Sequence, residues 1–292
     1  MSGTEMQMNR PLLVTGAAGQ LGTDVMELLS KHNIPAVGCT RTNLDITDSE
    51  QVHEVIGRIK PWGIIHAAAY TKVDQAEYES DEAYRVNVYG SRNVAAAAES
   101  IGSKILMLST DYVFDGRSTR PYDEFAAPRP INVYGSSKRE AEKIVCQLNR
   151  RAFIVRTSWI FGRYGSNFVK TMLEQGKTNH ELKVVHDQIG SPTYTKDLAE
   201  SIIQLINTDW YGTYHISNTG SCSWHQFACA IMEEASLNVK VRSVPTSQFP
   251  RPARRPAYSV LEGRSLRLHG LSPLRPWREA LADCIQALEV RN

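Results

Sequence analysis

The sequence has few cysteines, and none stand in close pairs. Among its 292 residues there are five, and no two have the spacing of a zinc site: Cys39, Cys146, Cys222, Cys229 and Cys284. An odd number of scattered thiols is typical of a protein from a reducing compartment. We therefore expect a cytoplasmic location and no disulfide framework.

Long hydrophobic runs and charge imbalance are absent too. No stretch approaches the roughly 18 apolar residues that a membrane span needs, and the first residues, MSGTEMQMNRP, lack the apolar core of a signal peptide. We expect the first nine residues to form a loose tail. With 33 basic and 31 acidic residues, the net charge of +2 gives no indication of a nucleic-acid or membrane partner.

What the chain does contain is an alternation of short apolar runs with helical periodicity. The runs PLLVTG, AVGCT, GIIHAAA, KILMLST and AFIVRTSW predict strands at 11–16, 36–40, 63–69, 104–110 and 152–159. Helices are predicted between them, among others at 48–59 with a capping box of Asp48 and Gln51, at about 80–100 and at about 134–149. This alternation predicts an α/β fold with a Rossmann-like, doubly wound parallel sheet.

Three glycines mark the first turn from strand to helix. The segment TGAAGQLG places Gly16, Gly19 and Gly22 three residues apart, with Gln20 and Leu21 among them. Such a loop lets backbone N–H groups and the positive end of a helix approach a phosphate. Its place in the first β-α-β unit indicates a dinucleotide-binding site. The alternative is a tight structural turn.

A position about 20 residues beyond the loop bears on the choice of cofactor. An acidic side chain there holds the ribose 2′-hydroxyl of NADH, whereas this chain has Thr40 and Arg41. Arg41 can pair with the 2′-phosphate of NADPH, which favours NADPH and leaves NADH possible; the alternative is a solvated loop cation. Asp45 is a second candidate near the adenine, unless it only begins the next helix.

Beyond residue 160 the alternation loosens. Helices are predicted at 166–176, 196–206, 223–237 and 273–289, and short strands at 182–187 and 213–217. Ser223 and Gln226 form a second capping box. We predict a NAD(P)-binding domain over residues 1–160, to which a segment near 195–218 returns. A smaller mixed α/β substrate-binding domain then takes up mainly residues 161–292 and builds half of a cleft.

Tyr134 and Lys138 stand four residues apart in NVYGSSK, on one face of a predicted helix. One interpretation is a partly buried tyrosine beside a lysine whose ammonium reaches solvent. The other is chemistry, because reduction of a ketone leaves an alkoxide that needs a proton. A phenol can supply this proton, and a nearby ammonium lowers the pKa of the phenol. Lys138 could also hold the nicotinamide ribose, and Thr110, at the end of a strand, could orient the carbonyl.

These motifs resemble the extended branch of the short-chain dehydrogenase/reductase superfamily over the first 160 residues. A closer resemblance, to the dTDP-4-dehydrorhamnose reductase family, extends from residue 11 to about 288. It is carried by HAAAYTKVDQAE, STDYVFDG, NVYGSSK, VRTSWIFG, DQIGSPTYTKDLA and RPAYSVLE. The related dehydratases follow the threonine with an Asp-Glu pair. Here Tyr112 stands in place of the glutamate, which favours carbonyl reduction over elimination.

The resemblance implies reduction of the C4 keto group of dTDP-4-dehydro-L-rhamnose to dTDP-L-rhamnose, with Thr110, Tyr134 and Lys138 as the catalytic triad. It implies cofactor contacts from Ala67, Ala68, Ala69 and Thr71. It also implies substrate contacts from Val73, Asp74, Tyr112, Trp159, Gln188 and Pro192, with core packing as the alternative for Trp159. Thr40 departs from the family, many of whose members have an acidic residue there, and this bears on the choice of nicotinamide cofactor rather than on the reaction.

The segment FPRPARRPAYSVLE places Arg251, Arg254 and Arg255 between prolines, which suppress helix. Arginines can bind the pyrophosphate of a nucleotide-sugar. We favour Arg255 because it adjoins the family-like RPAYSVL; a solvated linker is the alternative.

The histidines do not indicate a metal or a base. His66 ends a predicted strand and is expected to be structural, and no recognisable ligand set is formed by His180, Glu181 and His186. We predict no protein-built catalytic metal site.

Two other functions are compatible with these motifs. One is reduction of another 4-keto nucleotide-sugar, since the motifs specify the reaction better than the sugar or the base. The other is a non-catalytic NADP-binding regulatory subunit, similar to the beta subunit of methionine adenosyltransferase. The arginine-rich segment and the lack of an extended partner-binding tail favour the enzyme. A homodimer is possible, but the sequence does not reveal the oligomeric state.

Overall fold

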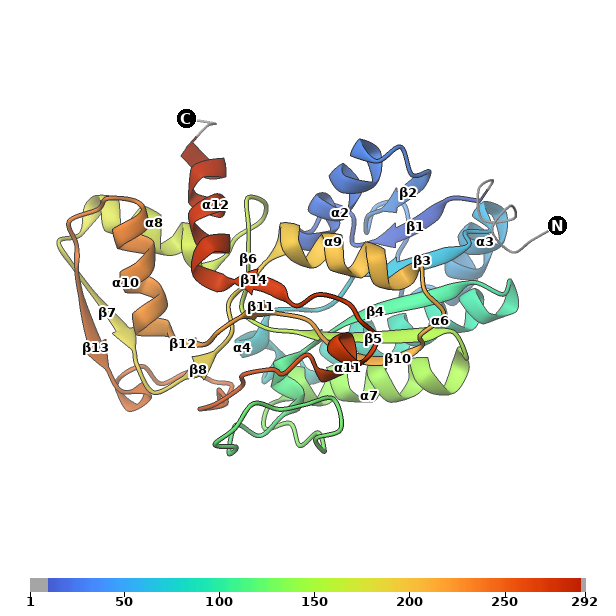
Figure 1. Cartoon of the computed structure of the whole chain (residues 1–292). Helices are drawn as coiled ribbons and strands as arrows, with labels where there is room; N and C mark the ends of the chain where they lie inside the picture. The colour runs from blue at the N-terminus through green and yellow to red at the C-terminus, as the bar shows by residue number, and fades with distance from the viewer. Residues whose placement is uncertain (1–9, 290–292) are drawn as a thin grey trace.

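A parallel sheet of six strands forms the centre of the larger lobe in the computed structural model, which describes residues 10–289 (Figure 1). The strands lie in the order β10-β5-β4-β3-β1-β2, and every neighbouring pair is parallel. Their bounds are β1 (Leu12–Thr15), β2 (Ala36–Cys39), β3 (Gly63–His66), β4 (Lys104–Thr110), β5 (Ala152–Thr157) and β10 (Gly212–His215). The predicted fold class is confirmed.

Helices cover both faces of this sheet (Figure 1). On one face α2 (Gln20–Lys31) and α9 (Thr195–Ile206) bury leucine, isoleucine and valine against the strands. On the other face α3 (Ser49–Ile59), α6 (Ser91–Ser100) and α7 (Val133–Leu148) do the same. The strands are therefore apolar on both sides, which explains why their sequences are continuous apolar runs rather than alternating ones.

The smaller lobe has a core of its own. Its apolar cluster is formed by α8 (Phe168–Thr178), α10 (Trp224–Glu234) and α12 (Trp277–Glu289), together with the parallel pair β7 (Glu181–Val185) and β13 (Lys240–Val244). Three short strand pairs connect the lobes: β6 (Ile160–Phe161) with β9 (Thr193–Tyr194), β8 (Ile189–Gly190) with β12 (Cys222–Ser223), and β11 (Asn218–Thr219) with β14 (Leu274–Pro276). Helix α9 and strand β10 return to the larger lobe.

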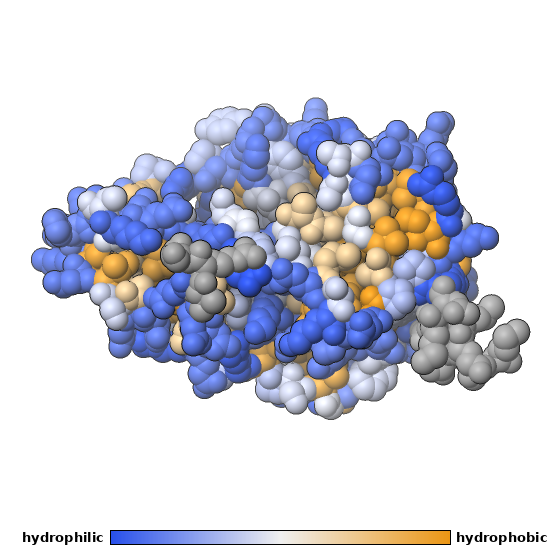
Figure 2. All heavy atoms as spheres, turned by 90° about the horizontal axis from the view of Figure 1, so that it is seen from above, coloured by the Kyte–Doolittle hydropathy of each residue, from blue (hydrophilic) through white to orange (hydrophobic). Residues whose placement is uncertain are grey.

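Short helices complete the connections. They are α4 (Val73–Ala76), α5 (Ser80–Tyr84), η2 (Asp111–Val113), η3 (Thr246–Gln248) and α11 (Arg264–Leu268). Hydrophilic side chains cover most of the face shown in Figure 2, and apolar atoms appear between them as patches. No helix among residues 10–289 has the length and apolar character needed to cross a bilayer. The tail expected at residues 1–9 lies outside the described residues.

Three local expectations need correction. The single helix expected at 80–100 is divided by a π-helical turn, η1 (Arg85–Gly90), in which the Asn87 side chain bonds to Tyr70 and Ser137. The last helix begins at Trp277, since the residues before it form β14. The strand predicted at 213–217 forms the edge strand β10 of the large sheet.

The third correction concerns the helix caps. Asp48 accepts hydrogen bonds from the backbone of Glu50 and Gln51, as an N-cap should. The reciprocal bond is missing, because Gln51 Oε1 accepts from the backbone N–H of Asp45 instead. The second capping box, formed by Ser223 and Gln226, is confirmed at the start of α10.

Two buried histidines hold the ends of strands in the large sheet. His66, at the end of β3, has its Nδ1 2.8 Å from Thr15 Oγ1 and its Nε2 3.0 Å from Ser91 Oγ. His215, at the end of β10, bonds through Nδ1 to the Tyr122 carbonyl. Burial lowers the pKa of each to about 3, so both are neutral in the folded chain at neutral pH. These contacts support a structural role for His66.

We predict that the free energy of unfolding decreases as the pH falls from about 7 to about 5. Histidine in the unfolded chain takes up a proton near its ordinary pKa of about 6.5, whereas His66 and His215 in the folded chain do so only near pH 3. The unfolded state then binds more protons across this window, which lowers stability at lower pH. Urea unfolding at both pH values measures the effect.

The variants His66→Gln and His53→Gln make a matched pair for this test. The first should reduce the pH dependence of stability, and the second, on the exposed surface of α3, should not. Equal stability at both pH values in the unmodified protein would contradict the prediction.

Candidate active site

A cleft of about 990 Å³ opens at the carboxyl edge of the large sheet. It lies where the chain order reverses, since β2 and β3 flank β1 on opposite sides. Doubly wound folds bind their ligands at this switch point. Of the residues that the sequence singles out, the cleft is lined by Gly16, Gly19, Gln20, Leu21, Gly22, Arg41, Asp45, Ala67, Ala68, Ala69, Thr71, Val73, Thr110, Tyr112, Tyr134, Lys138 and Trp159.

The glycine loop is packed too tightly for side chains. Gly16 has a φ of +68°, and a Cβ there would lie 2.8 Å from the backbone nitrogen of Ala68. A Cβ on Gly22 would lie 2.2 Å from the carbonyl oxygen of Gly16. Helix α2 begins without a side-chain cap at Gly19 and has no acidic residue in its first turn. Its open N-terminal amides therefore suit a phosphate, and the loop fits a dinucleotide.

The far end of the cleft carries the residues proposed for the adenosine side. Arg41 is exposed and lines the cleft. Asp45 accepts hydrogen bonds from the Thr47 backbone at 3.0 Å and from the Thr47 hydroxyl at 2.8 Å, and these bonds lower the pKa of its carboxyl. Asp45 thus orders its own turn as well as lining the cleft.

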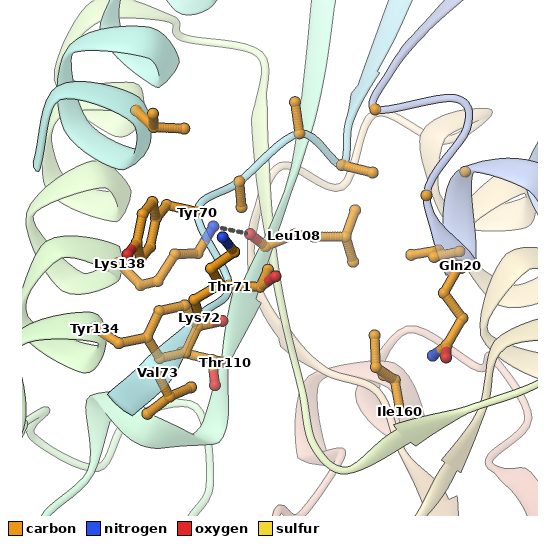
Figure 3. A pocket seen from close by; sticks show the side chains of 18 of the residues that line it. Gln20, Tyr70, Thr71, Lys72, Val73, Leu108, Thr110, Tyr134, Lys138 and Ile160 are labelled. Carbon is orange, nitrogen blue, oxygen red and sulfur yellow. Dashed lines mark hydrogen bonds between the residues drawn. The ribbon is translucent and has the colours of Figure 1, made fainter. Parts of the chain in front are cut away.

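The three residues expected to be catalytic converge at the middle of the cleft (Figure 3). Thr110 ends β4, and its hydroxyl accepts a hydrogen bond from the backbone N–H of Tyr112. Tyr134 and Lys138 come from the first turns of α7, which begins at the N-cap Asn132. Lys138 is buried, and its Nζ donates to the Leu108 carbonyl at 2.7 Å.

The sequence predicted that Lys138 lowers the pKa of Tyr134, whereas in the structure this pKa is raised and Lys138 is not among the groups that shift it. The pKa of Tyr134 is raised to about 12, mainly by burial and further by the negative charge of Asp111, while the Thr110 hydroxyl acts in the opposite direction. Burial also lowers the pKa of Lys138 to about 8, against the effect of Glu142. The Lys138 ammonium is bound to the Leu108 carbonyl. Tyr134 is a protonated phenol at neutral pH, as a tyrosine of ordinary pKa would also be, and this is the form that a proton donor requires.

A buried ion pair lies directly beneath this trio and was not found from the sequence. Glu142, one helical turn after Lys138, receives two hydrogen bonds of 2.8 Å from Arg156 on β5 and one of 2.6 Å from Ser109 on β4. Burial acts to raise the pKa of Glu142, but Arg156 and Ser109 lower it, so the carboxylate stays charged. The pair fixes α7 relative to the ends of both strands.

Asn87 is a second positioning residue missed in the sequence. Its side chain accepts from the backbone N–H of Tyr70 at 2.8 Å and donates to the Ser137 hydroxyl at 2.9 Å. It therefore ties the segment after β3 to the helix that carries Lys138. The π-helical turn places this asparagine, and a helical sequence pattern gives no signal for such a turn.

Asp111 is a third omission, although STD was recognised as a motif. It is buried in the cleft wall, and burial raises the pKa of its carboxyl to about 6. Thr110 donates to its Oδ1 at 3.1 Å, while Oδ2 has no hydrogen-bond partner within residues 10–289. Asp111 could have been predicted as a site residue from the sequence, because it is an acidic residue directly after a strand that ends in the predicted site.

Four of the residues predicted to bind substrate do not line the cleft: Asp74, Gln188, Pro192 and Arg255. Arg255 is held by Asp74 through two bonds of 2.9 and 3.0 Å, and its guanidinium lies 5.9 Å from the Tyr112 ring centre. Gln188 is buried and donates to the Thr246 hydroxyl, and Pro192 is buried. The Asp74–Arg255 pair connects the rim of the larger lobe to the proline-rich segment.

The sequence profile of the RmlD substrate-binding domain family matches residues 8–290. The chain belongs to this family. It is 44% identical to the spore coat polysaccharide biosynthesis protein SpsK of Bacillus subtilis, over 94% of this chain and 96% of that protein. It is 40% identical to a dTDP-4-keto-6-deoxy-D-glucose reductase of Streptomyces niveus, over 94% and 96% of the two chains.

A solved structure is similar throughout. The crystal structure of dTDP-4-dehydrorhamnose reductase from Bacillus anthracis in complex with NADP matches with a TM-score of 0.94 and 48% identity, over 96% of this chain and all of that one. The family resemblance drawn from the motifs is confirmed.

We predict that Arg41→Ala weakens NADPH binding by about tenfold or more and leaves NADH binding unchanged. The expected loss is that of one charge-assisted hydrogen bond to the 2′-phosphate. Fluorescence titration with both cofactors measures it. Arg58→Ala, which removes an exposed arginine paired with Glu54 on α3, is the control. Equal losses for NADPH and NADH would contradict a 2′-phosphate contact.

Proposed function

We propose that this chain is an NAD(P)H-dependent reductase that converts the C4 keto group of dTDP-4-dehydro-L-rhamnose to the hydroxyl of dTDP-L-rhamnose. The observation that carries the proposal is the convergence of Thr110, Tyr134 and Lys138 in the cleft that begins at the glycine loop. Membership of the RmlD family and the likeness to the Bacillus anthracis reductase support it.

The cofactor part of this proposal has the strongest basis. The structurally similar reductase from Bacillus anthracis was crystallised in complex with NADP, and this likeness confirms the prediction of NADPH. When bound, NADPH supplies the hydride. The open N-terminus of α2 suits its pyrophosphate, and Arg41 is placed to receive the 2′-phosphate.

The protein groups then have distinct tasks. Thr110 holds the carbonyl oxygen of the sugar, and Tyr134 donates the proton that neutralises the alkoxide. A phenol of ordinary pKa, about 10, is already protonated at neutral pH, and burial raises the pKa of Tyr134 further, so its proton is present when the alkoxide forms. Lys138 contributes positive charge beside the developing negative charge and can exchange the Leu108 carbonyl for ribose hydroxyls.

On the substrate side, we propose that residues 161–292 and the rim of the larger lobe hold the dTDP-sugar. Val73, Tyr112 and Trp159 line the cleft and bound the sugar. A pyrophosphate contact by Arg255 requires that it exchange its bonds to Asp74 for bonds to phosphate. Gln188 and Pro192 support the segment behind this wall rather than contact the cleft.

We predict that Tyr134→Phe lowers turnover about 100-fold or more while NADPH binding is retained, because the variant loses only the proton donor. The measurement is NADPH oxidation with dTDP-4-dehydrorhamnose, made in situ by the dehydratase and epimerase. Parallel reactions with NADH test the alternative cofactor. Turnover in the variant equal to that of the unmodified protein would exclude Tyr134 as the donor. No turnover in the unmodified protein, with NADPH binding intact, would exclude the proposed substrate.

We also predict that kcat/KM for NADPH decreases as the pH rises through about 8. This parameter reports groups of the free enzyme, and Lys138 loses its charge there, whereas Tyr134 stays protonated. The pH profile of the unmodified protein is compared with that of Lys138→Arg, whose charge persists at high pH. An alkaline decline that is identical in Lys138→Arg would assign it to another group.

A second candidate is reduction of a different 4-keto sugar. The relative from Streptomyces niveus is a dTDP-4-keto-6-deoxy-D-glucose reductase at 40% identity, a level close to that of the other relatives. The residues that face the sugar ring would decide between the two substrates. Turnover with the keto sugar before and after addition of the epimerase distinguishes them.

A further inference from the structure

Trp224 lies face to face with Trp159 in the wall of the cleft. The two ring centres are 3.5 Å apart, and the ring planes differ by 6°. Both side chains are half-buried and line the cleft. They come from distant segments, because Trp159 follows β5 and Trp224 is the first residue of α10.

Trp159 is held in an unfavourable backbone conformation. Its φ is +47°, in the left-handed region that side chains other than glycine rarely adopt. Its carbonyl accepts a hydrogen bond from the backbone N–H of Thr193. Its ring presses on Gly190, where a Cβ would lie 2.5 Å from the ring atom Cε2. Such strain persists only where the surroundings determine the conformation, and it is common in ligand sites.

Trp224 has firm support behind it. The capping box of Ser223 and Gln226 fixes the start of its helix. Strand β12, directly before the helix, pairs with β8 so that Cys222 lies opposite Gly190. The Phe168 ring also packs on Trp224 at 4.5 Å between centres. One compact unit therefore holds both surfaces against which the Trp159 ring rests.

We propose that Trp224 is a positioning residue that fixes the indole of Trp159 against the pyranose ring of the dTDP-sugar. This inference rests on the proposed function. A tryptophan needed only for the core would turn its ring inward, as Trp277 does within the same cluster without lining the cleft. Trp224 instead stacks one face of its ring on Trp159, which itself lines the cleft.

The role is expected to affect substrate affinity rather than the chemical step. A sugar ring packed on an indole gains similar energy in the ground and transition states, so its loss raises KM and leaves kcat nearly unchanged. An aromatic pair contributes enough that Trp224→Ala should raise KM for the keto sugar by up to about tenfold. Trp224→Phe, which keeps a flat ring, should restore most of the affinity.

The test is steady-state kinetics on Trp224→Ala, Trp224→Phe, Trp159→Ala and the double alanine variant. If Trp224 acts through Trp159, its removal adds no further rise in KM once Trp159 is absent. Two parallel indoles this close also couple as excitons, so their paired circular dichroism band should vanish in each single alanine variant. NADPH affinity, measured by fluorescence titration, should stay unchanged because neither tryptophan belongs to the glycine loop or to the Arg41 end of the cleft.

Trp277→Ala is the matched control for a lost tryptophan of the same apolar cluster. It should lower thermal stability and leave KM for the sugar unchanged. An active unmodified protein whose KM is the same in Trp224→Ala would overturn the inference and leave the proposed function intact. Additive losses in the double variant would also overturn it. An unmodified protein inactive on the keto sugars would instead refute the proposed function.

Discussion

The buried ion pair between Glu142 and Arg156 is the interaction on which the geometry of the site depends. Both side chains are almost fully removed from water and share two hydrogen bonds of 2.8 Å. Removing one partner of such a pair costs about 3–5 kcal/mol, because the other charge stays buried. The pair is therefore less a source of stability than a constraint, because it joins α7 to β5 and, through Ser109, to β4.

This constraint explains how Thr110, Tyr134 and Lys138, which come from two elements, meet in one cleft. Ser109 bonds to Glu142 at one end of the network, and Thr110 is its neighbour in β4. Lys138 stands one turn from Glu142 on α7, with Tyr134 one turn further. Asn87 adds a second tie from the opposite side, between the chain after β3 and Ser137. The site is thus built on rigid elements rather than on loops.

The two lobes contribute different structural features to the cleft. The larger lobe supplies glycine turns, an open helix end and protonation states set by burial, as in the neutral His66 imidazole. The smaller lobe supplies an aromatic wall, in which Trp159 is strained and supported by Gly190 and Trp224. Between them the Asp74–Arg255 pair joins the rims.

The sequence alone determined the succession of strands and helices along the chain, the glycine loop, and the pairing of Tyr134 with Lys138 on one helix face. Each of these depends on local spacing: apolar runs, tight turns and the helical repeat. Tertiary structure alone decided that Glu142 pairs with Arg156, that Arg255 pairs with Asp74, that burial raises the pKa of Tyr134, and that Trp224 lies on Trp159. These features depend on burial and on contacts between distant segments. Neither can be read from spacing, because desolvation and distance are fixed only when the lobes pack together.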